Sequence, residues 1–96
     1  MSAIIIIRVQ VADPSKLKSY QDVAPSIIEK YNGKLIVRGG EVISLEGPDE
    51  NRRIVVIEFP SLDEAKKFYY SDEYKEAIKL RSSVAEFEMI AVDCIN

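Results

Sequence analysis

The sequence of 96 residues contains no histidine and only one cysteine, Cys94. Without histidine there can be no histidine-based acid–base pair, no histidine metal site and no haem held by a histidine ligand. A lone cysteine cannot form an intramolecular disulfide or a cysteine-based metal site, and it suits a reducing compartment. We therefore predict a cytoplasmic protein that uses neither a metal nor a cofactor.

The sequence also lacks long apolar runs and clusters of basic residues. The apolar start, Ala3 to Ile7, is too short to span a bilayer, has no basic residue before it and alternates into Arg8 and Gln10 as a strand would. The formal net charge is −3, whereas a protein that binds nucleic-acid phosphates carries a basic stripe. The sequence therefore predicts no membrane anchor and no export signal. It also predicts no binding to nucleic acid.

What the sequence does contain is two apolar runs close together. Leu35–Val37 and Ile54–Phe59 are rich in β-branched and aromatic residues, which is typical of half-buried strands. Between them, Gly47–Asn51 consists of turn residues, so the two runs predict a central β-hairpin. Gly39 and Gly40 interrupt the pattern and predict a β-bulge, the alternative being a place where another group approaches the backbone closely.

The residues before this hairpin predict a strand and then a helix. Residues 3–11 alternate as a strand does, with both faces apolar at the start. Asp13 occupies the position of a helix N-cap and Pro14 that of the first helical residue. The pair Asn32–Gly33 ends the helix, since both residues tolerate the left-handed conformation. Pro25, inside the helix, predicts a kink or a short break.

The residues after the hairpin predict two short helices and a last strand. Ser61 and Glu64 form a capping box that starts the first of these helices. Ser71 and Asp72 have the character of a second N-cap, which starts the next helix. Phe87–Cys94 alternates in the manner of a final strand.

The order strand, helix, strand, strand, helix, strand is that of the ferredoxin-like βαββαβ fold, an α+β fold in a single domain spanning residues 1–96. Right-handed crossovers place the helices on one face of a four-stranded antiparallel sheet. The first and third strands are nevertheless apolar on both faces, and an open apolar sheet face is a liability in a soluble monomer. We therefore predict a homodimer in which a second copy covers that face.

Several short motifs are spread over most of the chain: Gly33, Arg38-Gly39-Gly40, Leu45-Glu46-Gly47, Glu58-Phe59-Pro60-Ser61, Phe68-Tyr69, Ser71, Tyr74 and Arg81. Together they resemble the domain of unknown function 1330 family. The resemblance implies a dimeric α/β barrel, in which two ferredoxin-like sheets close face to face. The chain departs from that family's usual pattern at Asn32, Phe68 and Asp72, where glycine, tryptophan and proline are common.

Three charged residues fall on otherwise apolar faces. Arg38 shares a strand face with Ile36, Glu58 lies on an apolar face of the third strand, and Arg81 lies on an apolar helical face. Charges are rarely buried without a partner. One interpretation is a structural ion pair between Glu58 and an arginine. The other is the polar end of an apolar pocket, where Arg38 or Arg81 binds an anionic group and Glu58 orients the guanidinium or transfers a proton.

The other candidate ligand-binding residues are two glycines and two tyrosines. Gly39 and Gly40 follow Arg38, and they would let a ligand approach the backbone. Tyr69 and Tyr74 lie on or near helical stripes that face the sheet. Such tyrosines pack in the core, or one or two of them line a pocket between helix and sheet.

Three functions stay open at this point. The first is a small enzyme, since the families related by the dimeric α/β barrel include cofactor-free oxygenases, lactone isomerases and haem-degrading enzymes. The second is a binding module that holds a small acidic or aromatic ligand between sheet and helices without turning it over. The third is a structural homodimer without a ligand. The arginines on apolar faces favour a small ligand, with Glu58 as the candidate catalytic residue, whereas no nucleophile or metal set indicates a reaction.

Overall fold

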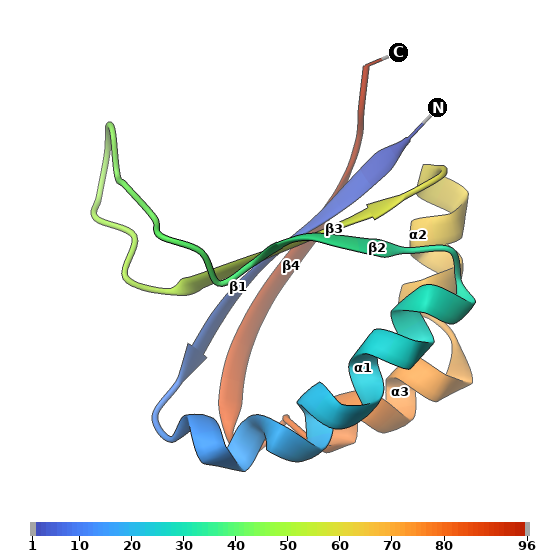
Figure 1. Cartoon of the computed structure of the whole chain (residues 1–96), viewed down its shortest axis with the longest axis horizontal. Coiled ribbons are helices and arrows are strands. Elements are labelled where there is room, and N and C mark those ends of the chain that lie inside the picture. Colours follow the sequence, from blue (N-terminus) through green and yellow to red (C-terminus); the bar gives the residue numbers. More distant parts are fainter. Residues whose placement is uncertain (1, 96) are drawn as a thin grey trace.

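The computed structural model describes residues 2–95, which form one sheet with helices on one side of it (Figure 1). The elements in chain order are β1 (Ala3–Val11), the 3-10 helix η1 (Pro14–Leu17), α1 (Lys18–Lys30), β2 (Lys34–Arg38), β3 (Arg53–Phe59), α2 (Leu62–Tyr69), α3 (Asp72–Lys79) and β4 (Ala85–Asp93). The strands lie in the order β2-β3-β1-β4, and all neighbours are antiparallel. Strand β2 therefore lies at an edge of the sheet, so the hairpin of β2 and β3 is not central as the sequence predicted. The ferredoxin-like fold expected from the sequence is confirmed.

The first strand, β1, lies in the interior of the sheet and contributes side chains to both faces. Ala3, Ile5, Ile7 and Val9 are buried against the helices. The alternate residues of β1 point to the other face, because successive side chains of a strand point in opposite directions. We call this other side the open face. By the strand register it carries Ile4, Ile6, Arg8, Ile54, Val56, Glu58, Glu88, Ile90 and Val92.

The first helix begins as its sequence predicts and continues through its proline. The side chain of Asp13 accepts a hydrogen bond from the Ser15 backbone N–H, and Pro14 opens the 3-10 turn. The α-helical segment then runs from Lys18 to Lys30 without the expected break at Pro25. On the buried side of this helix, Tyr20, Ala24 and Ile28 pack against the sheet. This packing outweighs the loss of one backbone hydrogen bond.

The two residues that end this helix have different roles. Asn32 takes the left-handed conformation with φ of 65°, as expected, whereas Gly33 does not. A Cβ atom on Gly33 would lie 2.7 Å from Ile28 Cγ2 and 2.7 Å from Phe59 Cε1. Glycine is therefore needed at position 33 because the chain passes close to two core side chains.

A β-bulge lies in β2, but earlier than the glycine pair suggested. The pairing of β2 with β3 shifts between Leu35 and Val37, which makes Ile36 the extra residue. The bulge reverses the alternation that follows it. Arg38 therefore pairs with Val55 and lies on the face of Leu35, not on that of Ile36 as the simple alternation predicted.

The hairpin connection is longer than the turn residues predicted. Strand β2 ends at Arg38, where Gly39 takes φ of +68° and donates its N–H to the Ile54 carbonyl over 2.9 Å. Strand β3 starts only at Arg53. Residues 39–52, which we call the arm, have no helix or strand of their own and project on the side of the sheet opposite the helices (Figure 1).

The two short helices start at the predicted caps. The Ser61 side chain accepts a hydrogen bond from the Glu64 N–H, and the Ser71 side chain accepts one from the Tyr74 N–H, each over 3.1 Å. These helices and α1 cover one face of the sheet around a core rich in aromatic rings. Within residues 2–95 no helix has the length and apolar character needed to cross a membrane.

Candidate functional site

The most unusual polar group on the helix-covered face is the guanidinium of Arg81. The sequence predicted it on an apolar helical face, but α3 ends at Lys79, so Arg81 lies just beyond the helix. Its side chain is nevertheless buried, with 7% of the residue exposed. Its guanidinium carbon lies 3.8 Å from the centre of the Phe87 ring on β4. Its Nη2 donates to the Tyr74 hydroxyl over 3.4 Å and approaches the Met89 sulfur at 3.7 Å.

Two tyrosines complete the surroundings of this arginine. The hydroxyls of Tyr20 and Tyr74 are hydrogen-bonded over 2.6 Å, and the Tyr20 ring meets the Phe87 ring edge-on. We call Tyr20, Tyr74, Phe87 and Met89 the aromatic cage. Burial raises the pKa of the Tyr20 hydroxyl well above its usual value, and the neighbouring Tyr74 hydroxyl raises it further. Tyr20 therefore stays protonated at neutral pH and cannot serve there as a base.

Arg81 has no carboxylate partner among residues 2–95. Its Nε is buried without a hydrogen-bond acceptor. Burying a charge is costly unless it is paired and hydrogen-bonded. Stacking on Phe87 offsets part of this cost through the cation–π attraction. The Nε–H of the guanidinium nevertheless remains a hydrogen-bond donor without an acceptor in the described part of the chain.

A groove runs beside this guanidinium, between the two short helices and strand β4. Its cavity volume is about 470 Å³. The lining is mainly apolar, with four side chains that carry polar groups: Lys66, Tyr69, Tyr70 and Arg81. No carboxylate of the described chain lines it. The groove thus combines apolar walls with positive charge, which suits an anion that has an apolar body.

A second, smaller cavity lies under α1. Its volume is about 70 Å³, and apolar side chains such as Leu17, Ile28 and Leu35 line most of it. Arg38 and Arg53 contribute to its lining from the neighbouring strands β2 and β3. Phe87 lines both the cavity and the groove, whereas Arg81 lines only the groove.

The structure does not bring together the three charged residues singled out in the sequence. Arg38 lies at the cavity under α1, and Arg81 lies at the groove. Glu58 is exposed on the open face, opposite Ile4 and Lys34 in the strand register. Among residues 2–95, Glu58 forms no ion pair with either arginine. The hypotheses of a Glu58–arginine pair and of one site containing all three are therefore not realised within the chain.

The remaining candidates divide between the groove and the arm. Tyr69 lines the groove, and Tyr74 is fully buried behind it as part of the cage. Gly39 and Gly40 lie at the start of the arm, and neither lines the groove. A Cβ on Gly39 would lie 2.5 Å from Arg53 Nε, whereas one on Gly40 would meet nothing within 4 Å. A close approach to the backbone therefore exists at Gly39, and it is made by an arginine of the same chain.

The sequence singled out Tyr74 near Arg81, but not Phe87, Met89 or Lys66. Phe87 and Met89 were predicted only as part of the last strand. The alternation of β4 places Phe87 and Met89 on one face, which was the available signal. Their contact with Arg81 depends on how α3 and β4 pack, which a local pattern does not reveal.

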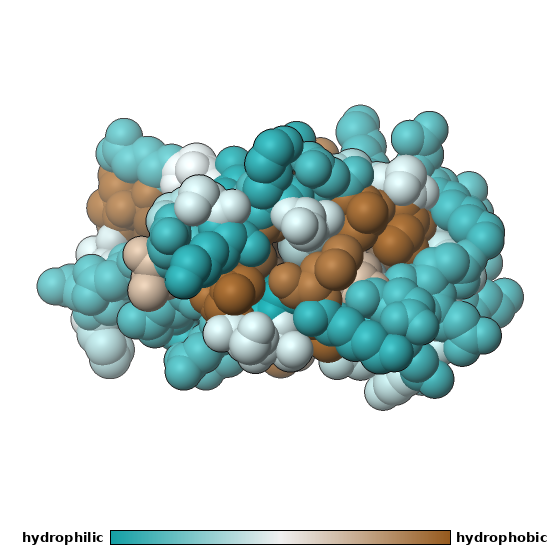
Figure 2. Space-filling model, turned by 90° about the horizontal axis from the view of Figure 1, so that it is seen from below, coloured by the Kyte–Doolittle hydropathy of each residue, from teal (hydrophilic) through white to brown (hydrophobic). Residues whose placement is uncertain are grey.

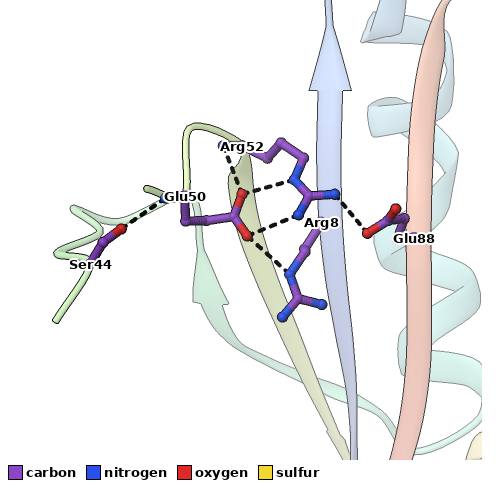
Figure 3. A network of polar contacts seen from close by, with 5 residues as sticks. All are labelled: Arg8, Ser44, Glu50, Arg52 and Glu88. Carbon is purple, nitrogen blue, oxygen red and sulfur yellow. Dashed lines mark hydrogen bonds and ion pairs between the residues drawn. The ribbon is translucent and has the colours of Figure 1, made fainter. Parts of the chain in front are cut away.

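A contrasting charged cluster lies on the open face at the base of the arm (Figure 3). The Glu50 carboxylate accepts hydrogen bonds from Arg8 Nε over 3.0 Å and from Arg52 Nε over 2.8 Å. Arg52 also donates to Glu88 over 2.6 Å. Hydrogen bonding from Arg52 lowers the pKa of Glu50 to about 2. We call these four side chains the ion network.

Comparison with known proteins places this chain in a family without an assigned function. The sequence model of a domain of unknown function, DUF1330, matches residues 2–95. The chain belongs to this family. No curated protein matches this DUF1330 chain. In the described part of the chain, no three histidine, cysteine, aspartate or glutamate residues are grouped so that they could hold a metal ion.

Solved structures resemble this DUF1330 protein in fold. A protein of unknown function from Rhodopseudomonas palustris is 20% identical, with a TM-score of 0.75 over 99% of this chain and 83% of the other. A dimeric protein of unknown function from Bacteroides fragilis is 18% identical, with a TM-score of 0.63 over 97% and 96%. A cofactor-independent oxygenase from Streptomyces nogalater is 9% identical, with a TM-score of 0.70 over 99% and 94%. At such identities the likeness shows the fold alone.

Proposed function

We propose that this DUF1330 protein binds a small ligand with an anionic group, and that Arg81 is the residue that receives the anion. The observation that carries the proposal is the buried guanidinium that has neither a carboxylate partner nor an acceptor for its Nε. A ligand carboxylate or similar group would supply both the missing charge and hydrogen-bond acceptors. Arginine is well suited to this task because its planar fork of donors matches a carboxylate.

The groove supports a ligand whose body is apolar or aromatic. Leu62, Ile78 and Met89 provide apolar walls, and Tyr69 and Tyr70 provide rings with polar tips. Lys66 adds a second positive charge. An aromatic or short aliphatic acid combines these features, which is the class of ligand expected from the sequence.

The geometry favours binding over proton-transfer catalysis. Among the described residues, no carboxylate lines the groove, and Glu58 lies on the opposite face of the sheet. Tyr20 is held in its protonated form by burial. The likeness to a cofactor-independent oxygenase supports an oxygenase or isomerase as the alternative function, but it does so through the fold only.

The open face supports a homodimer as the working form of this protein. Its isoleucines and valines include Ile90 and Val92, which are 51% and 43% exposed. No helix of the described chain covers them (Figure 1). A second copy related by a two-fold axis would bury the same apolar side chains from both partners. The dimeric relative from Bacteroides fragilis, which shares the fold, is in line with this arrangement.

The ligand proposal can be tested with simple acids and matched neutral compounds. Benzoate and hexanoate should raise the melting temperature of the wild-type protein, because ligands that bind the native state stabilise it. Benzamide and hexanol should produce smaller shifts. Titration calorimetry should then give affinities for Arg81→Met that are weaker by about tenfold or more, since one charged hydrogen-bonding group accounts for about 1.5 to 3 kcal/mol.

Arg52→Met is the matched control for this experiment. It removes a guanidinium that already has two carboxylate partners on the other face of the sheet. Its acid affinities should equal those of the wild type. Equal affinities for wild type and Arg81→Met, or no binding of any acid by the wild type, would contradict the proposal.

A further inference from the structure

The arm carries apolar side chains that nothing in its own chain covers. Val42, Ile43 and Leu45 are 40%, 69% and 88% exposed. Figure 2 shows apolar surface at the left end of the molecule, where the arm projects, apart from the apolar area in the middle of that view. Single exposed apolar residues are common on protein surfaces, but three within four positions of one projecting segment form a local patch.

This arm is held in place at its base. Glu50, within the arm, is bound by Arg8 of β1 and by Arg52 at the arm's end. The Glu50 N–H also donates to the Ser44 hydroxyl over 2.8 Å, which joins the two limbs of the arm. Figure 3 shows the guanidiniums of Arg52 and Arg8 both bonded to the Glu50 carboxylate from the same side. The arm is thus positioned in advance, which lowers the entropy lost when it binds a partner.

The arm projects from the sheet on the side of the open face. Arg8 lies on the open face, opposite Glu88 in the register, and it is one of the two arginines that bind Glu50. The arm therefore leaves the sheet on the same side as Ile90 and Val92, away from the helices (Figure 1). Anything that packs on the open face meets the arm beside it.

We infer that the arm docks on a second copy of this chain. Its apolar tip, made of Val42, Ile43 and Leu45, packs against the partner's open face. This inference rests on the homodimer proposed above. If a two-fold axis packs the two open faces together, it also places each arm beside the other copy. One symmetry operation then buries both sheet faces and both arms. At this end of the face the charges of the ion network are mutually paired, so the second copy meets no uncompensated charge there.

The test is to remove the apolar tip and measure dimerisation. Sedimentation equilibrium of the wild type should give a dimer, and the double variant Ile43→Ser/Leu45→Ser should raise the dimer dissociation constant at least tenfold. Leu80→Ser is the matched control, because Leu80 is a 42% exposed apolar residue that lies beyond α3, on the helix side. It should leave the constant unchanged. Circular dichroism should show that each variant is folded.

A second measurement locates the arm directly. A spin label at Leu45→Cys, in a Cys94→Ser background, is placed in one population and mixed with an unlabelled ¹⁵N population. Amides of β4 near Ile90 and Val92 should broaden in the ¹⁵N copy, although that copy carries no label. Broadening only at other positions would overturn the docking site.

The failures of the two proposals can be told apart. A wild-type monomer at micromolar concentration would overturn both the homodimer and the arm contact. A wild-type dimer whose constant is unaffected by the double variant would overturn the arm contact alone. Acid binding at Arg81 is measured separately, and neither result changes its test.

Discussion

A pair of arginines and a single arginine lie on opposite faces of the same sheet, and their surroundings differ. On the open face, Arg8 and Arg52 are partly exposed, and their guanidiniums bind the carboxylates of Glu50 and Glu88. On the helix-covered face, Arg81 is buried among aromatic rings with no carboxylate from residues 2–95. The paired cluster is the accessible one, and the unpaired arginine is the buried one.

The difference separates a structural role from a binding role. Ion pairs near the surface contribute little free energy, but they can hold a segment in position, as Glu50 holds the arm. A buried charge without a partner is not explained by stability, because burial alone makes it unfavourable. A few polar groups placed in a mainly apolar pocket are characteristic of ligand-binding sites. The contrast therefore directs the search for a ligand to Arg81 and the search for a partner to the arm.

The largest effect is expected from removing a wall of the cage. Tyr74 is 0% exposed, and it contacts Phe68 as well as Tyr20 and Arg81. Tyr74→Ala should lower the free energy of unfolding by about 3 to 5 kcal/mol, in the range of other buried aromatic truncations. Urea denaturation measures this loss.

The conservative variant divides that loss into packing and hydrogen bonding. Tyr74→Phe keeps the ring but leaves the Tyr20 hydroxyl without its partner, which should cost about 1 to 3 kcal/mol. If both variants were as stable as the wild type, the cage would not be the tightly packed centre that the structure shows.

A smaller effect is expected from the ion network. Glu50→Gln should lower the melting temperature slightly at low salt, and 1 M NaCl should reduce the difference, because salt screens accessible charges. The pKa of Glu50 is lowered from about 4.5 to about 2, so its contribution is fully present above pH 4.5. The contribution is lost as the pH falls through about 2.

Thermal melts of the two proteins between pH 7 and pH 2 measure this dependence. The difference between wild type and Glu50→Gln should be constant down to about pH 5 and disappear towards pH 2. A difference that grew on acidification would show that the sign of the Glu50 shift is wrong.

The smallest stability effect, and the most discriminating, is expected for Arg81→Met. Methionine keeps an unbranched apolar stem beside Phe87 and removes the unpaired charge, so the free energy of unfolding should stay the same or rise. Urea denaturation without ligand provides the measurement. A loss of about 3 to 5 kcal/mol, the cost of breaking a buried ion pair, would instead make Arg81 a structural residue.

Most of the fold could be predicted because its signals are local. Asp13, Ser61 and Ser71 mark helix starts through their own short side chains, and the structure confirms all three caps. The continuity of α1 through Pro25 was not foreseen, since the packing of Ala24 and Ile28 overrides the local rule. Much less of the candidate site was predictable: Arg81, Tyr69 and Tyr74 were predicted, but their neighbours Phe87 and Met89 were not.

The sequence by itself determined the order of elements, the apolar character of both sheet faces and the presence of an arginine next to the apolar residues of the last helix. Each follows from residue types and spacing along a short stretch. Only the tertiary structure decided which charges meet. The bulge at Ile36 turned Arg38 to the helix-covered face, while Glu58 stayed on the open face. The packing of α3 on β4 enclosed Arg81 without a carboxylate, because contacts between distant residues depend on register and helix placement.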